Sequence, residues 1–185
     1  VELTLNSLVS GLIKKGHSIK VIAPRNSKLN FKAREAELYC VDGKVPESWQ
    51  HRNYYEKEII NSDSIIALMF KKAISFREES DCILNLSYDL LPIRETLKFD
   101  MPIAHLISMG DESYEICNAI SEVYRKYPNN FAFHSLSQAA DFSFIKSPNI
   151  VGNGFDLSNY KYQDYENGPL AWVGRVAPEK GLEDA

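Results

Sequence analysis

The sequence lacks several features that mark major protein classes. No apolar run approaches the roughly 20 residues that a membrane-spanning helix needs. Basic residues are not in excess, because 21 Lys and Arg stand against 25 Asp and Glu, and this balance disfavours nucleic acid as a partner. Cys40, Cys82 and Cys117 are widely spaced in apolar segments, so we expect buried reduced thiols rather than disulfides or a metal site. A cytoplasmic location fits these absences best.

The composition is otherwise that of an ordinary globular chain. Its 185 residues are 44% hydrophobic and 11% aromatic, which is enough for one full domain and little more. The chain begins at Val1 inside a helical pattern and stops at Ala185 soon after a new helix opens. We therefore expect a piece of a longer protein, whose first strand, normally central in the sheet, is missing here.

Short β-branched runs alternate with segments of helical apolar spacing. The runs predict strands over residues 19–23, 37–41, 82–86, 101–107, 131–133 and 147–151. The spacing predicts helices over residues 1–15, 53–80 with an interruption near 61–64, 114–124 and 135–140. This alternation predicts an α/β fold with a doubly wound parallel sheet and helices on both of its faces.

Residues 170–181 form the stretch with the strongest functional signal. An apolar run ends at Gly174, Arg175 sits on the turn, and Pro178, Glu179 and Lys180 open a helix. Ligands bind at the carboxyl ends of parallel strands, and helix N-termini attract anions, so two cations at this point suit a diphosphate. The alternative is a surface loop with an ordinary helix start.

This motif, together with the Gly16-His17-Ser18 turn and the segment 152–156, resembles the GT-B glycosyltransferases, in particular retaining glycosyltransferase family 4. The resemblance implies that Arg175 and Lys180 bind the diphosphate of a nucleotide sugar such as UDP-glucose. It also implies hexose transfer to a hydroxyl with retention, and no metal cofactor. Within that family, segments 1–27, 85–92 and 102–110 look like UDP-glucose:tetrahydrobiopterin glucosyltransferases, which would make a pterin the small-molecule acceptor.

The resemblance also implies a division into domains. Residues 1–152 are expected to form the Rossmann-like acceptor-side domain, 153–168 the linker, and 169–185 the start of the nucleotide-sugar domain, with its first strand, loop and helix start. The glutamates that hold the donor sugar in the family would lie beyond residue 185, so the catalytic residues are unknown. The chain alone is expected to be inactive.

The residues that we expect to line the ligand-binding cleft lie in three places. They follow the strands over 82–86 and 101–107, begin the first helix, or precede the linker between the two domains. They are Glu2, Tyr88, Asp89, Ser108, Gly110, Asp111, Asn153 and Gly154. Tyr88 is expected to stack on a flat acceptor while Asp89 accepts its N–H groups. Helix capping is the favoured alternative for Asp89 and suffices to explain Asp111, and Glu2 suits a helix N-terminus. His105 lies inside its strand, so we interpret it as a core residue.

Three other functions remain open on the sequence. One is a nucleotide-sugar epimerase of GT-B shape. Another is a nicotinamide-dependent oxidoreductase, which should show a GxGxxG motif after its first strand, and no such motif is visible here. The third is a non-catalytic binding module on the same fold. The sequence before and after this chain would separate these functions.

Overall fold

The computed structural model describes residues 2–29, 36–45, 52–154, 161 and 168. Contacts divide the chain into two units, Val1–Phe155 and Asp156–Ala185, and the helices and strands below belong to the first. The strand, loop and helix start predicted from residue 169, with Arg175 and Lys180, lie outside the described residues.

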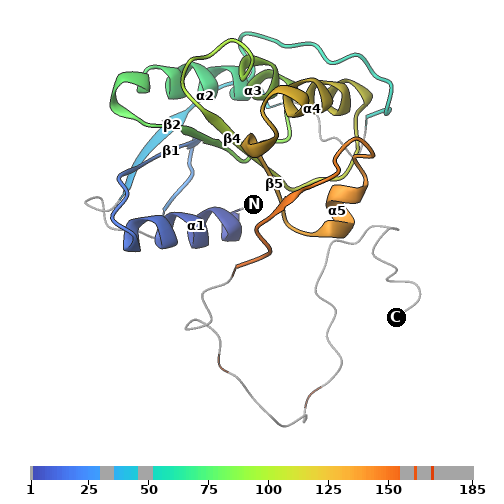
Figure 1. Ribbon diagram of the computed structural model, residues 1–185. Coiled ribbons are helices and arrows are strands. Elements are labelled where there is room, and N and C mark those ends of the chain that lie inside the picture. The colour runs from blue at the N-terminus through green and yellow to red at the C-terminus, as the bar shows by residue number, and fades with distance from the viewer. Residues whose placement is uncertain (1, 30–35, 46–51, 155–160, 162–167, 169–185) are drawn as a thin grey trace. The chain divides into compact units, whose positions relative to one another are not determined.

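Helices and strands alternate along the described chain (Figure 1). The strands are β1 Ile19–Pro24, β2 Ala36–Val41, β3 Ile83–Asn85, β4 Ile103–Ile107, β5 Phe131–Phe133 and β6 Asn149–Ile150. The α-helices are α1 Glu2–Lys14, α2 Ile65–Ile74, α3 Leu90–Glu95, α4 Tyr114–Lys126 and α5 Leu136–Ala140. Two 3₁₀ turns, η2 Arg77–Glu79 and η3 Pro128–Asn130, precede β3 and β5. The predicted α/β class is confirmed.

The strands pair in parallel, as predicted, but they form two sheets instead of the single sheet expected. One sheet has the order β1-β2, and the other has the order β3-β4-β5-β6. No backbone ladder in the described part of the chain joins β1 to β3. Helix α2 packs against β1 and β2 of the first sheet and against α3, and an ion pair of 3.1 Å joins Lys20 Nζ on β1 to Glu79 Oε2 in η2.

Apolar side chains gather in two clusters. The larger cluster surrounds β4, β5 and α4, where Ile107, Phe131 and Ile120 are almost fully buried. The smaller cluster joins α1 to the first sheet through Val9 and Val21. Figure 1 shows α2, α3 and α4 on one side of the strands, with α1 and α5 on the other. Burial of each large apolar side chain contributes about 1.5–3 kcal/mol, so the larger cluster fixes the carboxyl ends of β4 and β5.

Helix ends follow the chemistry that the sequence indicates in most places. Gly16 takes a φ of 87° just after α1, as a C′ glycine should. Ser135 Oγ caps α5 by accepting from Gln138 N at 3.1 Å. At α4 the expected capping by Asp111 is wrong, because Ser113 is the residue whose Oγ accepts from the helix, at Ile116 N.

The long helix predicted over residues 53–80 is wrong in its first part. Helix α2 begins only at Ile65, after Ser64, whose Oγ accepts from Ala67 N at 3.1 Å. Residues 53–61 form turns and extended chain instead. Hydrogen bonds to α4 hold this segment, since Tyr114 N donates to Tyr54 O at 3.0 Å. Tertiary contacts therefore override its helical apolar spacing.

Two expectations about single side chains have different outcomes. His105 is 1% exposed and lies within β4, which confirms its interpretation as a core residue. The cysteines carry free thiols, but Cys40 and Cys82 are exposed and Cys117 is only half-buried, so the expected burial is wrong for the first two. In β2 the exposed side chains are Glu37 and Cys40, and Cys82 lies one residue before β3.

Candidate functional site

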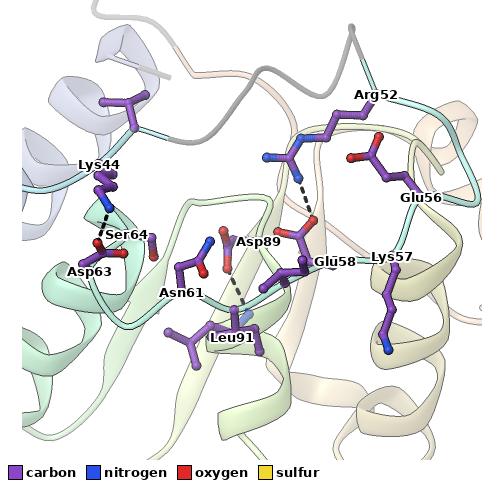
Figure 2. Close-up of a pocket in the computed structure, with 13 residues that line it drawn as sticks. Lys44, Arg52, Glu56, Lys57, Glu58, Asn61, Asp63, Ser64, Asp89 and Leu91 are labelled. Carbon is purple, nitrogen blue, oxygen red and sulfur yellow. Dashed lines mark hydrogen bonds and ion pairs between the residues drawn. The ribbon is translucent and has the colours of Figure 1, made fainter.

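A pocket opens next to the loops that follow β2 and β3 (Figure 2). Its volume is about 320 Å³, and its lining includes Lys44 after β2, Asp89 after β3, and several residues of segment 52–64. In open α/β sheets ligands bind at the carboxyl ends of parallel strands, and the pocket lies at such ends of two strands from different sheets. The pocket therefore occupies the position that the fold favours for a site, and it falls within the size range of small-molecule sites.

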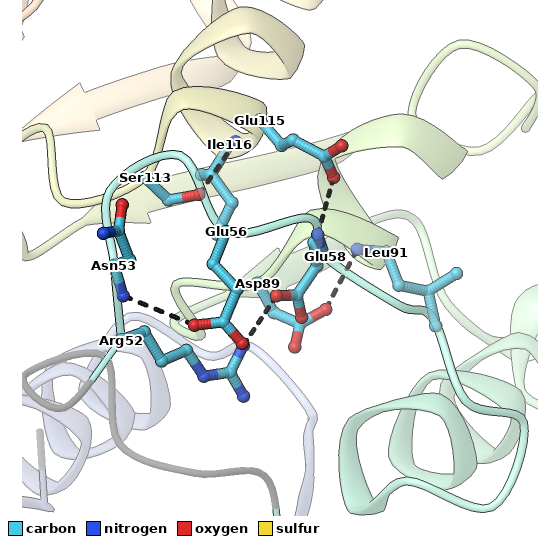
Figure 3. Close-up of polar contacts among 9 residues, drawn as sticks. All are labelled: Arg52, Asn53, Glu56, Glu58, Asp89, Leu91, Ser113, Glu115 and Ile116. Atoms are coloured by element: carbon cyan, nitrogen blue, oxygen red, sulfur yellow. Dashed lines mark hydrogen bonds and ion pairs between the residues drawn. The ribbon is translucent and has the colours of Figure 1, made fainter.

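An arginine and two carboxylates form the polar end of this pocket. Arg52 Nη1 lies 2.6 Å from Glu58 Oε2, and their side chains are only 12% and 10% exposed. Figures 2 and 3 show the carboxylate of Asp89 beside that of Glu58. Asp89 Oδ1 also accepts from Leu91 N at 2.9 Å, which caps α3. Asp89 thus has the capping role expected as one alternative, and it lines the pocket as well.

Burial and mutual repulsion shift the protonation of these carboxylates. Burial raises the pKa of Glu58 above its usual value, the Asp89 charge raises it further, and the Arg52 guanidinium opposes both effects. Burial also raises the pKa of Asp89, against the opposing hydrogen bond from Leu91 N and the Arg52 charge. The pair is therefore a stronger proton acceptor than two exposed carboxylates, and it favours ligands that donate hydrogen bonds.

Backbone contacts to α4 position the segment that carries Arg52 and Glu58. Glu58 N donates to Glu115 Oε2 at 3.0 Å, and Tyr114 N donates to Tyr54 O at 3.0 Å (Figure 3). Glu115 lies in the first turn of α4, whose amide groups also favour a carboxylate there. The extended segment 52–61 is consequently fixed against the start of α4.

A second group of polar side chains surrounds Asp111, at the carboxyl end of β4. Asp111 Oδ2 accepts from Tyr54 Oη at 3.0 Å, whereas its buried Oδ1 has no hydrogen-bond partner. Burial, and then Asp111, raise the pKa of Tyr54 to about 12. The same two causes raise the pKa of the Cys117 thiol to about 12. These hydroxyl and thiol groups therefore stay protonated at neutral pH and can donate to Asp111.

Tyr88 faces the protein interior rather than a ligand. Its side chain is 8% exposed and belongs to the larger apolar cluster. Glu112 N donates to its Oη at 3.2 Å, and burial raises the pKa of its hydroxyl. The expected stacking of Tyr88 on a flat acceptor does not fit this burial, because neither face of the ring is open. Tyr88 instead supports the loop that carries Asp111.

The remaining candidates lie at the ends of β4 and β6. Ser108 is exposed, and a Cβ at Gly110 would meet the carboxylate of Asp141. Gly152 has a φ of 69°, and the Asn153 and Gly154 that follow it are exposed. The structure therefore brings Asp89 to the pocket and Asp111 to the adjoining loop, but it groups neither with residues 152–154. Nothing is described of the side chain of Glu2.

Sequence reasoning missed Arg52 and Glu58. Their segment reads as part of a helix with solvated charges, and the run Glu56-Lys57-Glu58 carries no metal or catalytic spacing. The pairing depends on a turn that folds Arg52 back onto Glu58, in which Glu56 N donates to Asn53 O at 2.9 Å. Only Asn53, an exposed residue of a type that is common in turns, gives a weak signal in the sequence.

Comparison with known proteins adds no family to this geometry. No protein-family model matches the sequence, and a search of curated proteins also finds no match. Within the described residues, no helix is long and apolar enough to cross a membrane, and no group of three His, Cys, Asp or Glu side chains is arranged to hold a metal. The fold and the pocket define an α/β protein of parallel strands with a small polar site next to its strand ends.

Proposed function

We propose that this chain belongs to a glycosyltransferase that moves a hexose, from UDP-glucose, to a hydroxyl acceptor with retention. The observation that carries the proposal is the sequence Gly174-Arg175 followed by Pro178-Glu179-Lys180-Gly181, in its order after the turn at Asn153-Gly154. Its two cations suit a nucleotide diphosphate. The proposed enzyme has the GT-B architecture, works in the cytoplasm and uses no metal cofactor.

The chemistry assigns different tasks to the two ends of the chain. The leaving diphosphate gains negative charge in the transition state, so preorganised cations such as Arg175 and Lys180 lower the barrier. The acceptor, for which a pterin is the leading candidate, binds at the pocket lined by Arg52, Glu58 and Asp89. Support for this placement comes from the position of the pocket after parallel strands and from its small volume.

Steady-state kinetics of the complete protein with UDP-glucose test this proposal. Removing one diphosphate contact by Lys180→Ala should lower turnover on the order of a hundredfold, because such a contact is worth roughly 2–4 kcal/mol in the transition state. Arg175→Lys should rescue little, since an ammonium lacks the planar fork of a guanidinium. Lys161→Ala, at an exposed lysine, serves as the matched control and should change turnover by less than about twofold.

Three results would contradict the proposal. An unchanged turnover number in Lys180→Ala would show that Lys180 does not stabilise the leaving diphosphate. Conversion of the donor sugar without any acceptor would indicate an epimerase, and reduction of a nicotinamide would indicate an oxidoreductase.

A further inference from the structure

We propose that the pocket selects its acceptor by charge: it binds a neutral or cationic ring that carries N–H donors, and it rejects anionic acceptors. That the bound ring is the acceptor of the transfer rests on the proposed function. The selection by charge rests on the residues that line the pocket. We define the β3 pocket as the cavity lined by Lys44, Arg52, Glu58, Ile60 and Asp89 with their neighbours.

The volume of the β3 pocket limits what it can hold. At about 320 Å³ it lies at the lower end of the range for small-molecule sites. One ring system of two fused rings fits such a space, whereas a whole nucleotide sugar needs a longer cleft. The pocket is thus matched in size to an acceptor rather than to the donor.

One part of the lining is aliphatic and exposed. Val45, Ile59 and Ile60 all line the pocket, with exposed fractions of 79%, 70% and 42%. Three exposed aliphatic side chains around one cavity favour a ligand with a flat apolar face, because covering them removes apolar surface from water. A fully hydrated ion would leave this surface exposed.

The polar part of the lining is unsuited to an anion. The lining includes four acidic and three basic side chains, and two of the basic ones are already paired at 2.6 Å, Arg52 with Glu58 and Lys44 with Asp63. The third, Lys57, points away from Arg52 and Glu58 in Figure 2, and a phosphate or carboxylate bound at Arg52 would have to displace Glu58. It would also approach Asp89, which bears the same charge and is partly shielded from water.

Hydrogen-bond donors on the ligand have the opposite effect. Carboxylates accept only, so Glu58 and Asp89 together can take several N–H groups from one ring edge. Both carboxylates line the same pocket, as Figures 2 and 3 show, so N–H groups of one planar heterocycle can donate to them. The β3 pocket therefore fits a pterin-like ring in its neutral form and disfavours the same ring with an anionic substituent.

Binding of two fluorescent pterins to the complete protein tests the selection. Biopterin is neutral and 6-carboxypterin carries a carboxylate, and the fluorescence anisotropy of each reports its affinity. We expect biopterin to bind about tenfold more tightly, as repulsion from one nearby partly buried carboxylate predicts. Asp89→Asn should reduce this ratio to about threefold, because asparagine removes the charge and still caps α3.

The matched control is Glu95→Gln, at the other end of α3. Glu95 is a partly buried carboxylate paired with Lys98 at 2.6 Å and does not line the pocket, so its change should leave the ratio near tenfold. Any of four results would overturn the inference: equal affinities for the two pterins, tighter binding of 6-carboxypterin, no binding of either pterin, or an affinity ratio in Asp89→Asn equal to that in the control. If the pterins bind as expected while glucose is not transferred from UDP-glucose, the proposed function fails and the charge selection stands.

Discussion

Replacing His105 with phenylalanine should remove a dependence of stability on pH that this histidine creates. The imidazole is 1% exposed, stacked on Phe131 with a centroid distance of 4.9 Å. Its Nδ1 lies 3.1 Å from Asn85 Nδ2, and its Nε2 lies 2.8 Å from Thr96 Oγ1. The Thr96 hydroxyl donates to Pro92 O, so Nε2 carries the proton and Nδ1 accepts from the Asn85 amide. Protonation of Nδ1 would break that bond.

The size of this pH dependence follows from the difference between the pKa of the imidazole in the folded chain and in the unfolded chain. Burial lowers the pKa of His105 from 6.5 to about 4, a difference that corresponds to about 3 kcal/mol of folding free energy. Between these values the unfolded chain binds more protons than the folded chain, so stability falls as pH drops below 6.5. Between about pH 7.5 and pH 5 the loss from this group alone should be about 2 kcal/mol.

Urea unfolding followed by circular dichroism at both pH values measures this loss. The wild type should lose about 2 kcal/mol more than His105→Phe over the interval, since carboxylates titrate alike in both proteins. His105→Phe should also be less stable at pH 7.5, by about 1–3 kcal/mol, because two hydrogen bonds are lost. Ile107→Val, a core change that costs about 1 kcal/mol, is the control and should keep the wild-type pH dependence. Parallel pH profiles for wild type and His105→Phe would refute the reasoning.

Two further changes can be measured in the same unfolding experiments. Arg52→Met leaves Glu58 buried without its ion pair, so it should lower the free energy of unfolding by about 3 kcal/mol. Adding Glu58→Gln should restore most of this stability. A loss below about 0.5 kcal/mol in Arg52→Met would mean that the pair behaves like an exposed ion pair. Gly43→Ala should destabilise the protein by about 1–3 kcal/mol, because the new Cβ would lie 2.9 Å from the backbone of Ile65. Gly11→Ala, inside α1, should stabilise it by up to about 1 kcal/mol, because the new Cβ meets no atom within 4 Å. Equal effects of the two alanines would contradict the packing at Gly43.

The site was only partly predictable from the sequence. Asp89 was identified as a candidate because it follows a strand, and the same position explains both its capping role and its place in the pocket. Arg52 and Glu58 were not identified, because their segment has helical apolar spacing. Tyr88 was given a binding role that its burial does not support, since a strand-end aromatic can turn inward as readily as outward.

The sequence by itself determined the features that depend on neighbours along the chain. The β-branched runs predicted strands at β1 and β4, and both are present. The C′ glycine at position 16 and the cap at Ser135 likewise rest on local geometry and propensity. The parallel class also follows, because strands that alternate with helices connect most simply by crossovers.

Tertiary structure alone decided the features that join distant parts of the chain. The separation into two sheets depends on which strand edges meet. The path of residues 52–61 depends on two hydrogen bonds with the start of α4, in which Tyr114 N donates to Tyr54 O and Glu58 N donates to Glu115 Oε2. The Arg52–Glu58–Asp89 cluster depends on that path. Long-range pairing selects among conformations that have nearly equal local free energies, so no local pattern of residues specifies this cluster.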